Sequence, residues 1–335
     1  MPEKITILGD GAMGTVCSIL VNAGGHHATM WGAFEDSIER LLQNRENTRL
    51  LPGVRVPENV HLTANERDCF VGSTMVISAI PTQHLRKTWT RLAPHLPAGV
   101  PVVSVGKGIE IDTLQRPTQV IANVLKEFGK PASVAVLSGP NIAAELAKYQ
   151  PGSAVAACPD GAIAERVQQV MTTQWFRVYR NTDVIGVEIA GATKNIIALA
   201  AGMLDGMRAG NNAKATLVTR GLVEISRLGV AMGAQPSTFQ GLAGLGDLIT
   251  TCVSPEGRNR SVGEQLGRGV KLDDVLANMR SVAEGVPTAR AVHQLSQKYG
   301  VEMPISEQVY QILFEGKDVM RALSDLMTRE LKSEG

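Results

Sequence analysis

The most unusual polar residue in this sequence is a lysine in the middle of an apolar segment. The residues from Ile189 to Ala201 are apolar nearly all round, as in a helix that is buried. Lys194 must therefore either extend its ammonium to water or stay desolvated, where its charge is costly unless an anion faces it. Gly191 and Ala192 leave room for a ligand or another helix to approach. We interpret Lys194 as a candidate functional residue, and snorkelling to water is the alternative.

A glycine-rich turn near the N-terminus has the spacing of a dinucleotide-binding motif. Gly9, Gly11 and Gly14 follow an apolar run at Lys4–Leu8 and open a helix-forming run at Ala12–Ala23. The first glycine of such a motif permits the tight turn, the second lets a pyrophosphate approach the backbone, and the third lets the helix pack on the strand. The first N–H groups of the helix then face the phosphates. We predict dinucleotide binding here, and a turn without a ligand is the alternative.

Polar residues follow two other predicted strands. Lys107 lies between two glycines after the strand at Val100–Val105, and Asn141 follows the strand at Val134–Leu137. Ligands of open parallel sheets bind in the crevice outside the carboxyl ends of the strands. We therefore expect Lys107 and Asn141 to face the same crevice as the glycine turn. An ordinary solvated loop lysine is the alternative for Lys107.

The C-terminal half contains an aspartate after a glycine-rich run and a cluster of cations. Asp247 belongs to a tight loop, and the alternative role for its side chain is to cap a helix that starts at Leu248. Arg258, Asn259 and Arg260 combine a guanidinium fork, an amide and a second cation, which together suit a phosphate group. A solvated basic turn would have the same sequence.

The position that distinguishes NAD from NADP lies at the end of the second strand, predicted at His26–Trp31. An acid there reads a free ribose 2′-hydroxyl, and an arginine there binds a 2′-phosphate. This sequence has Gly32-Ala33 at that position, with Glu35, Asp36 and Arg40 further along. The preference between the two cofactors is therefore left open.

Short apolar runs alternating with helical patterns indicate an α/β protein with two domains. A polar loop at 43–57 interrupts the alternation, and beyond Asp183, the predicted N-cap of a long helix, no strand-like alternation appears. We predict a Rossmann-like, mainly parallel sheet domain at residues 1–182 and an all-helical domain at residues 183–335. Besides those named above, the predicted strands are 74–81, 154–157 and 176–179, and the predicted helices are 83–92, 183–207, 288–299 and 306–315.

Composition excludes several classes of function. The 335 residues include 33 basic and 32 acidic ones, so no global field favours nucleic acid or an anionic membrane. The sequence has no uninterrupted apolar stretch of about 18 residues and no signal peptide, which predicts a cytoplasmic protein without a membrane span. The four cysteines are scattered without a CxxC pair, so we expect reduced, mostly buried thiols and no metal site. The oligomeric state stays open, with a homodimer as one candidate.

Six short segments also carry a resemblance to a known family. They are GDGAMG at 9–14, VGKG at 105–108, SGP at 138–140, GATKN at 191–195, GLGDL at 244–248 and RNR at 258–260. In this order and spacing they resemble the bacterial-type NAD(P)-dependent glycerol-3-phosphate dehydrogenases over nearly the whole chain, and the later segments are far more specific than the first. The resemblance implies a fold like that of 6-phosphogluconate dehydrogenase, with NAD or NADP as the cofactor.

The resemblance further implies roles for individual residues. Lys194 would be the proton acceptor and donor. The residues that would contact the substrate are Lys107, Gly139, Asn141, Lys194, Asp247, Gly257, Arg258 and Asn259. Besides Gly9, Gly11 and Gly14 of the turn, the residues that would contact the cofactor are Ala12, Met13, Ala33, Lys107, Ala143, Arg258, Val282 and Glu284.

Five sites depart from the family's usual pattern. Asp10 replaces a common alanine and Ala12-Met13 replaces a common serine–aromatic pair, but neither change removes a backbone N–H that a phosphate could use. Ala33 stands where a histidine or arginine is frequent, so a preference for NADP is not implied. Asn141 replaces a serine or threonine and can still donate and accept. Gly257 replaces a serine, so only its backbone can contact the substrate.

The implied reaction is reversible hydride transfer between C4 of the nicotinamide and C2 of dihydroxyacetone phosphate, which gives sn-glycerol 3-phosphate for glycerophospholipid synthesis. Lys194 would protonate the developing alkoxide; desolvation would lower its pKa, Asp247 would hold the ammonium with the opposite effect, and the sequence leaves open which effect is larger. Arg258 and Asn259 would bind the phosphate.

Two alternative functions remain. One is a related dehydrogenase that acts on a 3-hydroxy acid or a hydroxyacyl thioester, which a catalytic histidine would favour. The other is a non-catalytic cofactor-binding regulator, which would need no buried lysine.

Overall fold

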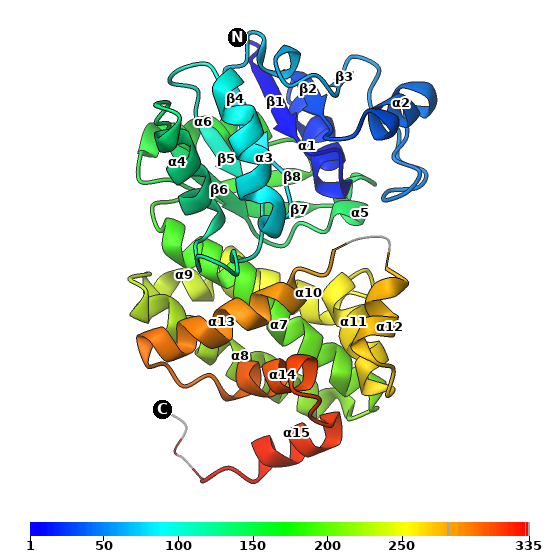
Figure 1. The fold of residues 1–335 in the computed structure, drawn as a ribbon, viewed down its shortest axis with the longest axis vertical. Coiled ribbons are helices and arrows are strands. Elements are labelled where there is room, and N and C mark those ends of the chain that lie inside the picture. Colours follow the sequence, from blue (N-terminus) through cyan, green and yellow to red (C-terminus); the bar gives the residue numbers. More distant parts are fainter. Residues whose placement is uncertain (280–281, 332, 334–335) are drawn as a thin grey trace.

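The computed structural model describes residues 1–279, 282–331 and 333. The N-terminal part is built on one eight-stranded sheet with the order β3-β2-β1-β4-β5-β6-β7-β8, and Figure 1 shows it above a helical part. All neighbouring strands are parallel except β6 and β7. The strands are β1 (Lys4–Leu8), β2 (His27–Trp31), β3 (His61–Thr63), β4 (Met75–Ser78), β5 (Val102–Ser104), β6 (Val134–Ser138), β7 (Gly152–Ala157) and β8 (Phe176–Asn181).

Helices cover both faces of this sheet. Met75 and Ile77 of β4 belong to the apolar core that includes residues of α1 and α6. Val76, which points to the other face because side chains alternate along a strand, belongs to the core that includes Trp89 of α3 and Val120 of α4. The helices of this part are α1 (Ala12–Ala23), α2 (Glu35–Asn44), α3 (Leu85–Leu92), α4 (Pro117–Glu127), α5 (Ala143–Leu146) and α6 (Gly161–Met171).

The sequence predicted seven of these eight strands, with bounds that differ by up to three residues, and the helices α1 and α3, but it did not predict β3, α2, α4, α5 or α6. β1 and α1 have the predicted bounds. Of the loop predicted at 43–57, Gln43 and Asn44 belong to α2, and residues 45–57 contain no helix or strand beyond one isolated bridge between Glu46 and Arg55. β3 was not predicted, because three residues are too short to display an alternation. The helix predicted at 83–92 is divided, since a 3-10 turn at Thr82–His84 precedes α3.

The C-terminal part is helical, and its central helix is α7 (Val184–Gly206), which packs against α8, α10, α11 and α13. Figure 1 shows α7 running through the middle of this part. No strand follows β8 in the described residues, as predicted. The other helices are α8 (Gly210–Ala231), α9 (Pro236–Gln240), a π-helical turn (Leu242–Gly246), α10 (Asp247–Val253), α11 (Arg258–Gly267), α12 (Leu272–Ala277), α13 (Gly285–Tyr299), α14 (Pro304–Phe314) and α15 (Val319–Met327).

Glycines allow α7 and α11 to touch backbone to backbone. A Cβ atom on Gly202 of α7 would lie 1.9 Å from the carbonyl oxygen of Arg260, and one on Gly263 of α11 would lie 1.9 Å from that of Leu199. No side chain fits at such distances. The close contact places the beginning of α11, where the predicted phosphate-binding residues lie, beside the middle of α7.

Asp183 caps α7, as its sequence position predicted. Its Oδ1 accepts a hydrogen bond of 2.8 Å from the N–H of Gly186, and its Oδ2 accepts one of 2.7 Å from the Thr238 hydroxyl. By length and composition α7 could cross a membrane, but 89% of the residues in its most apolar window are buried inside the protein. In the described chain α7 is therefore a core helix, because its apolar surface is covered by other helices.

Candidate active site

The glycine turn between β1 and α1 has the geometry that a dinucleotide requires. Gly9 has a φ of +114°, and a Cβ atom there would lie 2.8 Å from the carbonyl oxygen of Ala79. A Cβ atom on Gly14 would lie 1.8 Å from the carbonyl oxygen of Gly9, so the helix can pack on the turn only with glycine at this position. A Cβ atom on Gly11 would meet nothing within 4 Å. The space above Gly11 is open, at the N-terminus of α1, and it fits a pyrophosphate.

Lys194, Asp247 and Lys107 form one cluster where the two domains meet. Asp247 Oδ1 lies 3.1 Å from the Nζ of Lys194 on α7, and Asp247 Oδ2 lies 2.7 Å from the Nζ of Lys107, which follows β5. Lys194 is only 4% exposed and Asp247 only 2%. Lys194 therefore does not snorkel to water, because the carboxylate of Asp247 faces its charge inside the protein.

Each lysine of the cluster has further oxygen partners. Lys194 donates a hydrogen bond of 2.6 Å to the hydroxyl of Thr251, which in turn donates to the backbone carbonyl of Asp247 at 2.6 Å. Lys107 donates to the side-chain oxygen of Asn141 at 2.7 Å and to the carbonyl of Gly139 at 3.0 Å. Lys107 and Asn141 thus face one crevice, as the positions of their strands predicted.

The cluster carries more positive than negative charge, since one carboxylate serves two ammonium groups. Burial lowers the pKa of Lys107 to about 8. Asp247 opposes this shift, whereas the charges of Lys194 and Arg258 reinforce it. A desolvated surplus of positive charge attracts a polar or anionic substrate group.

Asp247 does not cap α10. Gly246 occupies the N-cap position, Asp247 is the first residue of the helix, and its carboxylate points to the two lysines. Thr251 lies one helical turn later on the same face, which is how it also reaches Lys194. We assigned Thr251 no role from the sequence, although the four-residue spacing from Asp247 is a signal that could have found it.

The start of α11 separates the three residues that were predicted to bind phosphate together. Arg258 is the first residue of the helix and makes no ion pair with the described residues. The side-chain oxygen of Asn259 accepts a hydrogen bond of 2.9 Å from the N–H of Gly285. Arg260, by contrast, binds Asp205 at 2.7 Å, so we correct its predicted role to a structural one. Successive residues of a helix point in different directions, which explains the separation.

At position 257, the N-cap of α11, a residue larger than glycine would fit poorly. A Cβ atom there would lie 3.0 Å from the carbonyl oxygen of Thr251 and 3.1 Å from that of Ser254. These contacts are tight, and the neighbouring backbone would have to shift to admit a serine. The backbone around position 257 therefore leaves room for glycine but not for the serine that is usual there.

Glu284 offers a buried acceptor beside the crevice. Its Oε1 accepts a hydrogen bond of 2.9 Å from the N–H of Thr82, but its Oε2 and the Thr82 hydroxyl have no partner within the described chain. Burial raises the pKa of Glu284, although the Thr82 N–H and the charge of Arg258 oppose the shift. A Cβ atom on Gly108 would lie 2.9 Å from Oε2. Buried polar atoms without partners are rare, and an amide or hydroxyl of a dinucleotide fits this place.

Four of the remaining predicted cofactor residues lie on the sheet domain, and the fifth, Val282, precedes α13. Ala12 and Met13 form the first turn of α1, Ala33 follows β2, and Ala143 begins α5; all four are partly buried. Val282 is 42% exposed.

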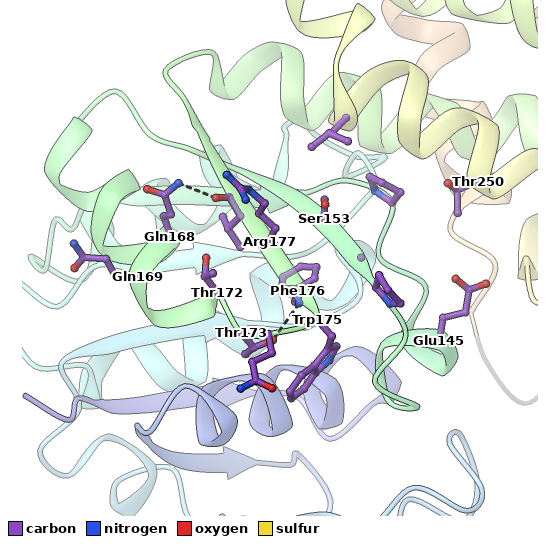
Figure 2. Close-up of a pocket in the computed structure, with 16 residues that line it drawn as sticks. Glu145, Ser153, Gln168, Gln169, Thr172, Thr173, Trp175, Phe176, Arg177 and Thr250 are labelled. Atoms are coloured by element: carbon purple, nitrogen blue, oxygen red, sulfur yellow. Dashed lines mark hydrogen bonds between the residues drawn. The ribbon is translucent and has the colours of Figure 1, made fainter.

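A second hollow, of about 940 Å³, lies at the outer edge of the sheet and is separate from the lysine cluster. Residues of α6, of β8 and of the loop between them line most of it, together with Glu145 of α5 and the start of β7. Pro140, Glu145, Leu242 and Thr250 lie close in sequence to residues of the candidate active site. Figure 2 shows Gln168, Thr172 and Arg177 around it, with Thr250 of α10 at one end. None of the residues predicted to bind substrate or cofactor lines this hollow.

Comparisons with known proteins show the family of this chain. A sequence profile for the NAD-dependent glycerol-3-phosphate dehydrogenase N-terminus matches residues 4–164, and one for the C-terminus of the same enzymes matches residues 183–324. The chain belongs to this family. The family, the NAD(P)-dependent oxidoreductase class and the fold predicted from the motifs are thereby confirmed.

Individual members of the family are similar over their full length. The NAD(P)+ glycerol-3-phosphate dehydrogenase of Citrifermentans bemidjiense is 46% identical over 337 residues, which covers 100% of each chain. The enzyme of the same name from Chlorobium phaeobacteroides is 47% identical over 331 residues, 99% of each chain. The crystal structure of glycerol-3-phosphate dehydrogenase from Coxiella burnetii superimposes with a TM-score of 0.93 at 33% identity, covering 98% of this chain and 99% of that one.

Proposed function

We propose that this protein catalyses the reversible NAD(P)H-dependent reduction of dihydroxyacetone phosphate to sn-glycerol 3-phosphate, with Lys194 as the general acid and base. The observation that carries the proposal is the buried cluster of Lys194, Asp247 and Lys107 between the domains. Membership of the glycerol-3-phosphate dehydrogenase family supports the same substrate. The family relation does not favour either alternative, a 3-hydroxy acid dehydrogenase or a non-catalytic regulator.

Lys194 would deliver the proton. In the reductive direction its ammonium polarises the carbonyl at C2 and then protonates the alkoxide that develops there; in the oxidative direction its amine accepts the same proton. The carboxylate of Asp247 and the hydroxyl of Thr251 hold the Nζ of Lys194 at 3.1 and 2.6 Å, so that it does not need to be oriented during the reaction.

Lys107 and Asn141 would position the substrate beside Lys194. Both reach the crevice from the carboxyl ends of neighbouring strands, β5 and β6, and they contact each other at 2.7 Å. The nicotinamide cofactor supplies the hydride when it is bound. The glycine turn would bind its pyrophosphate, and Glu284 with Thr82 would accept and donate hydrogen bonds to its polar groups.

Arg258 and Asn259 would bind the substrate phosphate. Arg258 makes no direct ion pair or hydrogen bond with a carboxylate in the described part of the chain, although Glu284 interacts with its charge, so its guanidinium is available for a charge-assisted pair of hydrogen bonds. The free N–H groups at the start of α11 favour an anion at the same place. Binding energy gained at the phosphate would place C2 next to Lys194.

We also propose that the enzyme acts in the cytoplasm and supplies glycerophospholipid synthesis. The four free cysteines are buried, which suits a reducing compartment.

We place the domain boundary between residues 182 and 183, because β8 ends at Asn181 and α7 begins at Val184.

Substitution of Lys194 tests the proposal. Turnover with dihydroxyacetone phosphate is followed by the absorbance of NADH and of NADPH. Loss of a positioned acid–base group should reduce turnover by about 10² to 10⁴ in Lys194→Met, with little effect on cofactor affinity. Lys194→Arg should be impaired as well, because arginine keeps the charge but hardly releases a proton.

Lys214→Met is the matched control. Lys214 is an ion-paired lysine of the helical domain that binds Asp205 and not the cluster, so its loss should leave turnover nearly normal. Near-normal turnover in both Lys194 variants would refute the acid–base role and direct attention to Lys107.

A further inference from the structure

The end of β2 lacks an acid of its own. Gly32-Ala33 occupies the position at which a dinucleotide-binding domain usually reads the adenosine ribose. Glu35 and Asp36 come next, but both are exposed on the first turn of α2. Asp36 is paired with Arg40 at 2.6 Å. The recognition of the ribose must therefore come from another part of the chain or be absent.

Asp10, the residue between the first two glycines of the turn, reaches this position from β1. Its Oδ2 accepts a hydrogen bond of 2.5 Å from the hydroxyl of Ser37 on α2. A Cβ atom on Gly32 would lie only 2.9 Å from the Cγ of Asp10 and 2.8 Å from the Cδ1 of Ile38. Glycine at position 32 thus leaves the space in which the carboxylate of Asp10 lies against the end of β2.

The backbone of Asp10 is held on both sides. The N–H of Gly9 donates to the carbonyl of Trp31 at 2.8 Å, which ties the turn to the last residue of β2. Asn47, from the polar loop that follows α2, donates to the carbonyl of Asp10 at 3.0 Å. The carboxylate is therefore placed by the fold and does not depend on a flexible side chain for its position.

We propose that Asp10 is the acid that reads the ribose 2′-hydroxyl and makes this enzyme prefer NADH to NADPH. The proposal rests on the cofactor site of the proposed function. With Oδ2 occupied by Ser37, Oδ1 has no recorded donor among the described residues and can accept from a 2′-hydroxyl. A 2′-phosphate at the same place would meet a carboxylate, and Arg40 of α2 is already paired with Asp36.

Calorimetric titration of NADH and of NADPH, without substrate, tests the proposal. The wild type should bind NADH at least about tenfold more tightly than NADPH, since it gains a charge-assisted hydrogen bond with one and meets a like charge with the other. Asp10→Asn should lower that ratio to within about threefold of unity, because the amide does not repel the phosphate. Higher salt should reduce the wild-type ratio by screening the repulsion.

Four variants separate the contact from its surroundings. Glu35→Gln and Asp36→Asn test the two acids that lie where the sequence alone would place the ribose acid, and Glu39→Gln removes an exposed charge on the same helix. All three should keep the wild-type ratio. Ser37→Ala should lower the ratio less than Asp10→Asn does, because it releases the carboxylate without removing its charge.

Equal affinity of the wild type for both cofactors, or an unchanged ratio in Asp10→Asn, would overturn the proposal. A change of ratio in Glu35→Gln or Asp36→Asn equal to that in Asp10→Asn would overturn it too, by assigning the effect to the general field. Failure of both cofactors to bind the wild type would instead refute the cofactor site itself. That result differs from equal binding, so the two failures can be told apart.

Discussion

Two buried ionic clusters join the sheet domain to α7, and they differ in how completely their groups are satisfied. In the first, Glu188 accepts hydrogen bonds from the guanidinium of Arg116, from the N–H of Thr118 at 2.8 Å and from the Thr118 hydroxyl at 2.7 Å. In the second, Asp247 serves both Lys107 and Lys194. The first cluster has one charge of each sign, whereas the second has an excess of positive charge.

The difference indicates which cluster holds the domains and which can bind a substrate. Arg116 and Glu188 are both less than 10% exposed and satisfy each other, so a ligand would gain nothing there. Burial raises the pKa of Glu188, and Arg116 and Thr118 oppose that shift. Both clusters form where α7 packs against the sheet domain, but only the cluster with excess positive charge can gain by binding a substrate group.

Breaking the satisfied cluster should have the largest effect on stability. Glu188→Ala leaves the guanidinium of Arg116 buried without its anion, which costs about 3 to 5 kcal/mol of unfolding free energy. Denaturant titration measures the change. In the double variant Arg116→Met/Glu188→Ala much of the loss should be recovered, because the unpaired charge is gone. A loss below about 1 kcal/mol in Glu188→Ala would show that the pair is not a structural tether.

The excess charge of the other cluster should appear as a pH dependence. Because the pKa of Lys107 falls from 10.5 to about 8 in the folded protein, the unfolded chain binds one more proton between these values. The stability of the wild type relative to Lys107→Met should therefore rise with pH across that interval, by up to about 3 kcal/mol. Denaturant titrations of both proteins at pH 7.5 and pH 10.5 check this. If the difference in unfolding free energy between the two proteins does not change with pH, burial does not lower the pKa of Lys107.

The same contrast exists between neighbouring arginines of α11, with a smaller effect. Arg258 makes no direct ion pair with the described residues, although its charge interacts with that of Glu284, whereas Arg260 is bound to Asp205. Arg258→Ala should raise the Michaelis constant for dihydroxyacetone phosphate by about ten- to a hundredfold, equivalent to 1.5 to 3 kcal/mol. Arg260→Ala should instead lower the melting temperature and leave that constant within about threefold. Equal use of unphosphorylated dihydroxyacetone by the wild type would contradict a phosphate site.

The sequence alone was sufficient for features that depend on neighbouring residues. The three glycines of the first turn, the bounds of β1 and α1 and the cap at Asp183 follow from local conformational rules. Lys194 could be singled out because the apolar residues around it predict a buried helix and make its charge costly. The family motifs then identified the enzyme class without coordinates.

Only the tertiary structure decided which of these groups meet. Lys107 and Asp247 are 140 residues apart, and no local pattern states that one carboxylate bridges two lysines. Three other contacts likewise depend on packing. Arg260 binds Asp205, Asp247 at the start of α10 pairs with Lys194 of α7, and the carboxylate of Asp10 lies against the end of β2. The physical reason is that conformational propensity and hydrophobic periodicity depend on a few neighbouring residues, whereas ion pairs form between residues that the packing of distant elements brings together.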